Sequence, residues 1–244
     1  MSGASDDVAA AARKVEPRST SSSQMRRALA AEFLGTALLL ATVVGSGVMG
    51  VNLSQGNNGV ALLANAAATA GMLYVLITIL GPISGAHFNP AVTLVMRMRG
   101  ELPSRVALGY AAMQVLGALL GVMIAHAMFE LAFLQLGTHA RSGPAQWLSE
   151  GVATFGLLLT ILLGVRHRAS ATPALVASYI FAAYWFTAST SFANPAVTLA
   201  RSLTQSFAGI RPMDVAGFVL AQLVGAMLAL LAFGLLAPQR DETR

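Results

Sequence analysis

Apolar residues occur along the chain in long stretches that are separated by short polar segments. A helix crosses the roughly 30 Å apolar core of a bilayer in about 20 residues, and each stretch approaches that length. The pattern therefore predicts an all-α membrane protein with six transmembrane helices. Their approximate bounds are residues 28–49, 60–80, 106–129, 148–165, 173–190 and 215–236.

Two connecting segments, residues 81–99 and 191–201, do not read as ordinary loops. They are too apolar to lie in water and too short to cross a membrane. Non-helical backbone at membrane depth is stable only where it is buried in protein or lines a water-filled cavity. We therefore predict two re-entrant segments, each containing a half-helix.

The two re-entrant segments contain the same six residues, NPAVTL. The first copy lies within HFNPAVTL (87–94) and the second within FANPAVTL (192–199). A second similarity relates the starts of the first and fourth apolar stretches, AEFLGTALLL and SEGVATFGLLL, and aligns Glu32 with Glu150. Matches in the same order indicate an internal repeat and not a chance motif.

A third match, between YAAMQVLGALLG and FVLAQLVGAMLA, aligns Gln114 with Gln222. The repeats cover about residues 27–130 and 147–237. Each contains three spans, and because three is odd, the two halves must have opposite orientations in the membrane. Inverted repeats of this kind place the functional site near the bilayer midplane, at the interface of the halves.

Composition supports a membrane protein and excludes several other classes. The chain is 56% hydrophobic and 10% charged, with a mean hydropathy of +0.68. A soluble domain carries about 25% charged residues. Cysteine is absent, which excludes disulfides and thiolate metal sites. No His, Asp and Glu cluster has metal-site spacing, so we predict no metal, no cofactor and no catalytic centre.

The net charge of +5 indicates topology and not nucleic-acid binding, because the basic residues lie in short segments between the spans. All but three of the 15 Lys and Arg residues fall on the side that holds both termini; the three are Arg141, Arg201 and Arg211. Cytoplasmic loops carry the excess of Lys and Arg. Both termini are therefore predicted to be cytoplasmic.

The ends of the chain are polar. Residues 1–26 are rich in Ala and Ser and lack the basic start and apolar core of a signal peptide. We predict a disordered cytoplasmic tail there, a channel domain over residues 27–237, and a cytoplasmic C-terminal tail over residues 238–244.

The NPAVTL copies read as helix starts, because Asn is a preferred N-cap and Pro is favoured at the first helical position. Two such half-helices would meet near the midplane with their positive dipole ends facing each other. Each asparagine oxygen would cap its helix and each NH₂ group would be left to bind solute. The predicted pore-lining residues are Asn89, Pro90, Ala91, Asn194, Pro195 and Ala196.

The paired NPA boxes, the AEFLGT start, the GPISGAHFNPAVT run and the six-span inverted repeat resemble the aquaporin and aquaglyceroporin (major intrinsic protein) family over about residues 27–237. The resemblance implies six tilted helices and two half-helices around a pore in each protomer. It also implies a homotetramer in the cell (inner or plasma) membrane, with the bilayer and small neutral solutes as its partners.

The resemblance also implies roles for three titratable residues. Glu32 and Glu150 match glutamates that hold the re-entrant loops by accepting backbone hydrogen bonds, and His87 matches a histidine that packs in the loop and lines the vestibule. A carboxylate inside a span is costly and usually functional or paired. A proton relay is therefore the alternative role for the glutamates. His126 is expected to be a satisfied interior histidine.

The chain departs from the family at its selectivity ring. Most members carry arginine three residues after the second box asparagine, where this chain has Val197. Family offsets place the other ring positions at Thr69, Ala182 and Ser191. Such a ring has small side chains and no charge, so we expect a wide constriction. Arg201, one helical turn beyond Val197, could reach back toward the mouth of the pore, but we expect it to face a loop or lipid headgroups.

A wide, uncharged ring predicts a passive channel for glycerol, urea or metalloid hydroxides such as arsenous acid, as well as water. The run YWFTASTSFANPAVTLARSL resembles bacterial aquaporin-like channels associated with arsenic resistance. A water-selective channel is the alternative. A coupled secondary transporter also uses inverted repeats, although it usually needs ion-coupling carboxylates at the midplane. A structural membrane protein also remains open.

Overall fold

The computed structural model describes residues 22–237, and within that range the chain is entirely helical, as predicted. The elements in chain order are α1 (Ser22–Leu53), α2 (Asn58–Ser84), α3 (Pro90–Met98), α4 (Ser104–Met128), α5 (Pro144–Arg168), η1 (Ala169–Ala171), α6 (Thr172–Phe186), α7 (Pro195–Arg201), η2 (Pro212–Asp214) and α8 (Val215–Leu236).

The six predicted spans correspond to α1, α2, α4, α5, α6 and α8. Five helical segments of the described range are long and apolar enough to cross a membrane. One of them, Pro144–Phe186, contains both α5 and α6, which are joined by the single turn η1 and pack against each other. The first span is longer than predicted, since residues 22–26 belong to α1 and not to a tail. The remainder of both predicted tails lies outside the described residues.

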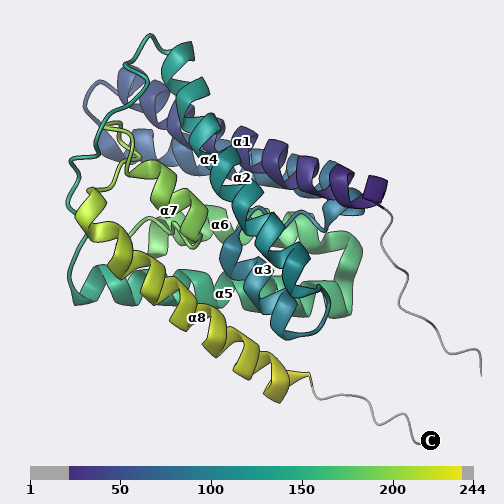
Figure 1. The fold of residues 1–244 in the computed structure, drawn as a ribbon. Helices are drawn as coiled ribbons and strands as arrows, with labels where there is room; N and C mark the ends of the chain where they lie inside the picture. Colours follow the sequence, from purple (N-terminus) through teal and green to yellow (C-terminus); the bar gives the residue numbers. More distant parts are fainter. Residues whose placement is uncertain (1–21, 238–244) are drawn as a thin grey trace, which may run out of the picture.

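The helices pack as two similar halves. In the first, α1 packs against α4 and α2, and in the second, α5 packs against α8 and α6. Contacts between α2 and α6 join the halves (Figure 1). The start of α1 and the end of α8 lie at the same end of the bundle, as an even number of crossings requires (Figure 1).

Glycines allow the closest of these helix contacts. A Cβ atom added to Gly117 or Gly121 of α4 would overlap a backbone carbonyl oxygen of α1. The equivalent glycine of the second half, Gly225 of α8, faces the carbonyl oxygen of Gly151 on α5 in the same way. In lipid, helix association depends on packing and is favoured by small residues that let backbones approach. The same contact therefore recurs in both repeats.

The two half-helices cross over between the halves. Helix α7 of the second half packs against α4, and α3 of the first half packs against α8 (Figure 1). Their side chains enter the core of the opposite half: Val197 packs in a cluster with Leu40 of α1, and Val92 packs in a cluster with Leu158 of α5. Each half therefore completes the core of the other.

Candidate functional site

The two NPAVTL segments start helices as the sequence predicts. The Asn89 side-chain oxygen accepts a hydrogen bond from the Ala91 N–H at 2.9 Å, and the Asn194 oxygen accepts from the Ala196 N–H at 3.0 Å. Both asparagines have extended backbone, and a proline follows at the first helical position. The half-helices therefore begin at equivalent points of the two repeats, with unpaired N–H groups at their tips.

The amino groups of these asparagines are less free than the sequence suggested. Asn89 Nδ2 donates to the Ala193 carbonyl oxygen at 2.7 Å, and Asn194 Nδ2 donates to the Phe88 carbonyl oxygen at 2.8 Å. Each asparagine thus binds the residue that precedes the asparagine of the other repeat. Because an NH₂ group carries two hydrogens, one donor on each side chain remains for a solute.

The backbone before each asparagine is strained. Phe88 and Ala193, one residue before the boxes, both have φ of 48°, and Ala86 and Ser191, two residues further back, have φ of 50° and 51°. This left-handed region is unfavourable for residues with a side chain, at a cost of about 1–3 kcal/mol each. The same conformation in both repeats must therefore be held by the surroundings.

Glu32 of α1 holds the first strained segment. One carboxylate oxygen accepts hydrogen bonds from the Ser84 hydroxyl at 2.6 Å and the His87 N–H at 3.0 Å. The other accepts from the Phe88 N–H and the Gln114 amide, both at 2.7 Å. Four donors point at one buried carboxylate, so its lone pairs are used to fix the loop.

Glu150 of α5 repeats this arrangement with three donors. It accepts from the backbone N–H groups of Phe192 and Ala193, both at 2.9 Å, and from the Gln222 amide at 2.7 Å. The Gln222 amide also donates to Thr198 of α7 at 2.7 Å. These contacts favour the loop-supporting role over a proton relay, because the carboxylate oxygens are engaged as acceptors.

The glutamines are site residues whose role the sequence did not assign. Gln114 links Glu32 to Thr93 of α3, with a bond of 2.9 Å to the threonine hydroxyl, as Gln222 does in the second half. The signal was present in the repeat, which aligns Gln114 with Gln222. A polar side chain at the same buried position of both halves indicates that the same contact forms inside each repeat.

His87 and His126 each lie beside a threonine hydroxyl. His87 lines the cavity, and its Nδ1 lies 3.1 Å from the Thr93 hydroxyl. His126 is buried between the Phe133 carbonyl oxygen and the Thr204 hydroxyl, at 3.0 and 2.9 Å, as a satisfied interior histidine. Within residues 22–237, no group of three His, Cys, Asp or Glu side chains is placed to hold a metal ion.

A cavity of about 280 Å³ passes the tips of both half-helices. Its lining is mostly apolar, with polar groups placed at intervals. The apolar lining includes Val43, Leu73, Val92, Val176, Ile180 and Val197. The polar lining includes Thr69, His87, Asn89, Glu101, Thr172, Tyr184, Ser191, Asn194 and Arg201.

Three of the four predicted ring residues, Thr69, Ser191 and Val197, are buried and line this cavity. The fourth prediction is not supported, because Ala182 is exposed on α6 and is not part of the lining. Tyr184 lines the cavity instead, and its hydroxyl lies 3.3 Å from that of Thr69. Two residues turn a helix by about 200°, so these two positions lie on opposite faces of α6.

Arg201 also differs from its prediction. Its Nε donates to the Ala208 carbonyl oxygen, so the side chain does contact a loop. It is, however, only 2% exposed and lines the cavity, and it does not reach lipid headgroups. Its guanidinium carbon lies 3.3 Å from the centre of the Phe192 ring. The cavity wall therefore contains a cation one helical turn beyond the predicted ring position Val197.

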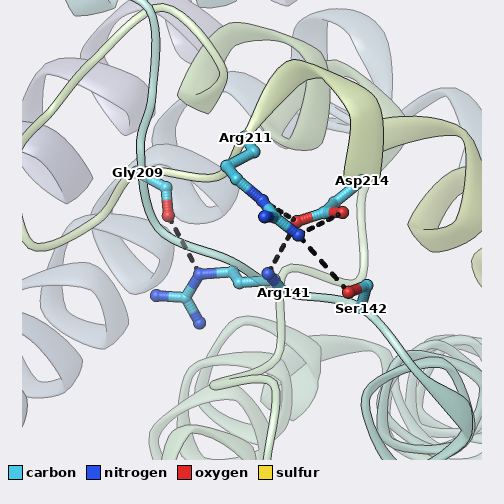
Figure 2. Close-up of polar contacts among 5 residues, drawn as sticks. All are labelled: Arg141, Ser142, Gly209, Arg211 and Asp214. Carbon is cyan, nitrogen blue, oxygen red and sulfur yellow. Dashed lines mark hydrogen bonds and ion pairs between the residues drawn. The ribbon is translucent and has the colours of Figure 1, made fainter.

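A loop cluster of polar contacts is formed around Arg141, Arg211 and Asp214 (Figure 2). The Arg141 backbone N–H donates to Asp214 at 2.7 Å, and its side chain donates to the carbonyl oxygens of Gly209 and Ser189 at 2.9 and 3.1 Å. Arg211 forms an ion pair with Asp214 at 3.0 Å. Burial lowers the pKa of Arg141, and the charges of Glu150 and Tyr184 oppose this shift only in part. The connection from α4 to α5 is thereby fastened to both segments that flank α7.

Comparisons with known proteins agree with this geometry. The sequence profile described as "Major intrinsic protein" matches residues 19–187. The chain is 57% identical over 221 residues to the aquaglyceroporin AqpS of Rhizobium meliloti (strain 1021), covering 90% of this chain and 94% of the relative. It is 30% identical to a probable glycerol uptake facilitator protein of Thermotoga maritima, covering 62% of this chain and 70% of the relative.

The fold agrees as well. The X-ray structure of the aquaglyceroporin from Plasmodium falciparum superposes with a TM-score of 0.70 at 16% identity, covering 88% of this chain and 98% of that one. The inverted repeat, the paired half-helices, the cavity between them and the match over most of the chain lead to one conclusion. The chain is a multi-pass membrane channel that belongs to the major intrinsic protein family.

Proposed function

We propose that the protein is a passive channel for small uncharged solutes that carry hydroxyl or amide groups, such as glycerol, urea and arsenous acid, and that water also passes. The observation that carries this proposal is the lining of the cavity. The lining contains amide donors and a hydroxyl, from Asn89, Asn194 and Thr69, together with aliphatic side chains such as Val197. A polyol presents both hydroxyl and C–H surfaces, and this lining matches both.

Ser191 lines the cavity with a small side chain, which leaves room for such a solute. The relatives named aquaglyceroporin and glycerol uptake facilitator support solutes larger than water.

One observation favours the narrower alternative, a water-selective channel. Tyr184 lines the cavity beside Thr69, where the sequence predicted the small Ala182, so the lining there contains an unpredicted aromatic ring. Small neighbours at Ser191 and Val197 offset this bulk, which is why we favour the larger solutes. Vesicles that pass water and exclude glycerol, urea and arsenous acid would establish the alternative.

A coupled carrier is disfavoured by the contacts between the halves. Alternating access requires one repeat to rock against the other. Here Asn89 and Asn194 bind the opposite re-entrant segment, and α3 and α7 pack in the cores of the opposite halves. Both sets of contacts favour a fixed pore, which predicts flux nearly linear in solute concentration and no saturation.

Stopped-flow light scattering of vesicles containing the purified protein tests the proposal. Asn194→Asp keeps a capping oxygen and removes the amide donor, and we expect neutral-solute flux to fall about tenfold, the equivalent of one lost hydrogen bond. Asn57→Asp is the matched control, because Asn57 caps α2 in the same way but lies outside the cavity lining. Wild-type flux in a correctly inserted Asn194→Asp protein would refute the assignment of the pore.

We also propose that the channel is a homotetramer in the cell membrane with both termini in the cytoplasm. The bias of Lys and Arg toward the side of the termini supports the orientation. Native mass spectrometry tests the tetramer, and protease accessibility of an epitope fused to the C-terminus tests the orientation. A monomer in mild detergent, or an epitope that is cleaved from outside intact cells, would contradict these assignments.

A further inference from the structure

Arg201 is the largest fully buried side chain of the described structure, and it forms no ion pair within residues 22–237. Its one hydrogen bond from Nε goes to the Ala208 carbonyl oxygen, and its face lies on the Phe192 ring. An arginine inside a membrane domain is costly and is retained where it serves a pathway or a partner. Arg201 lines the cavity, so the cavity is the pathway that this side chain can serve.

The terminal amino groups of Arg201 have no hydrogen-bond partner within the described residues, although a guanidinium carries five N–H donors. These amino groups are absent from the buried, unsatisfied atoms of the described range, so they are open to the cavity that the side chain lines. The guanidinium is therefore a fixed positive charge with free donors at the cavity wall.

The position of this charge follows from helix geometry. Arg201 follows Val197 by four residues on α7, which is about 6 Å along the helix axis at 1.5 Å per residue. Asn194 caps α7 at the tip where the half-helices meet, so Arg201, the last residue of α7, lies further from that tip than Val197 does. Both Arg201 and Val197 line the cavity, so the charge acts at a different depth of the pore from Val197.

The neighbours of Arg201 hold it there. Phe192 lies against its guanidinium, and the guanidinium carbon of Arg141 lies 5.1 Å from the centre of the same ring. Arg141 is in turn fixed by the carbonyl oxygens of Gly209 and Ser189. An aromatic face attracts a guanidinium, and the attraction strengthens where water is excluded.

We propose that Arg201 is a selectivity residue of this pore: it repels cations at a point one helical turn from Val197, and it leaves the constriction at Val197 open to large neutral solutes. Size and charge selection are thereby separated along the cavity. The inference deepens the proposed function and rests on it.

Urea and guanidinium test the inference, because they have nearly the same planar shape and differ in charge. Flux is measured by stopped-flow in vesicles loaded with K⁺ and treated with valinomycin, so that K⁺ leaves as guanidinium enters. We expect the wild-type channel to pass urea and exclude guanidinium. We expect Arg201→Gln to pass urea and to raise guanidinium flux about 100-fold, which corresponds to two like charges about 6 Å apart at an effective dielectric constant of about 20.

Three further variants make the outcome decisive. Arg201→Lys keeps the charge and should still exclude guanidinium. Arg201→His, which is neutral at pH 8, should admit it, and this variant serves where the glutamine protein does not insert. Arg211→Gln is the matched control, because Arg211 lies in the same loop cluster but pairs with Asp214 and does not line the cavity.

Guanidinium exclusion by a urea-conducting Arg201→Gln or Arg201→His channel would overturn the inference, as would guanidinium flux through the wild type at the rate of urea. A wild-type protein that passes none of water, urea and glycerol would instead refute the proposed function. The two failures are therefore distinguishable in one series of measurements.

Discussion

Replacing Glu32 by glutamine measures how strongly the strained backbone before α3 depends on one carboxylate. Glutamine keeps the shape of the side chain but converts one acceptor oxygen into an NH₂ donor. Each oxygen of Glu32 accepts from two donors. Whichever way the glutamine amide is oriented, its NH₂ group therefore faces two donors, and two hydrogen bonds are lost. Hydrogen bonds to a charged group contribute about 1.5–3 kcal/mol each, so we expect the free energy of unfolding to fall by about 3–6 kcal/mol.

Glu150→Gln provides the comparison inside the same molecule. One oxygen of Glu150 accepts from Phe192 alone, and the other accepts from Ala193 and Gln222. The amide can therefore turn its NH₂ toward Phe192 and lose one acceptor contact, at about 1.5–3 kcal/mol. The structure predicts that Glu32→Gln costs about twice as much stability as Glu150→Gln.

Thermal unfolding in detergent, followed by the fluorescence of Trp147 and Trp185, measures both changes. At about 2–4 °C per kcal/mol for a chain of this size, Glu32→Gln should lower Tm by roughly 10 °C and Glu150→Gln by about half as much. Glu101→Gln is the control, because the Arg99–Glu101 ion pair is partly exposed and contributes about 1 kcal/mol or less. An equal or larger loss for Glu150→Gln would refute the reasoning from donor counts.

Three other changes have expected outcomes. Gly121→Ala should lower Tm by several degrees, because its Cβ would overlap a carbonyl oxygen of α1; Gly71→Ala, in open space, should leave Tm unchanged or slightly higher. Tyr184→Ala should raise the ratio of glycerol to water permeability several-fold, whereas Tyr184→Phe should leave it near the wild-type value, since the ring keeps its volume. Arg141→Gln removes two charge-assisted bonds of about 1.5–3 kcal/mol each, so hydrogen exchange in residues 202–211 should quicken.

The sequence predicted the helices and the half-helices because hydrophobic length and N-cap chemistry are local properties. NPAVTL specifies a helix start wherever it occurs, and the structure begins α3 at Pro90 and α7 at Pro195. The internal repeat added the equivalence of Glu32 and Glu150, whose hydrogen bonds are nearly the same in the two halves. These features needed no knowledge of tertiary contacts.

The lining of the cavity could not be predicted to the same degree, because it depends on how each helix is rotated. Counting twelve residues back from Asn194 gives Ala182, but the rotation of α6 turns Tyr184 toward the cavity. Arg201 was expected to face a loop or the headgroups, and the Phe192 ring and the Ala208 carbonyl oxygen that hold it at the cavity are tertiary contacts. The missing information was the position of a side chain on a packed helix.

The hydrogen bonds that Asn89 and Asn194 form to the opposite repeat also constrain the order in which the protein folds during its synthesis. The carbonyl that Asn89 requires belongs to Ala193, which is synthesised 104 residues later. While the ribosome is still translating the second half, the first re-entrant segment lacks its partner and the core around Val92 is incomplete. The first segment must therefore remain unfinished during insertion, and closure of the pore is a late step that both halves take together.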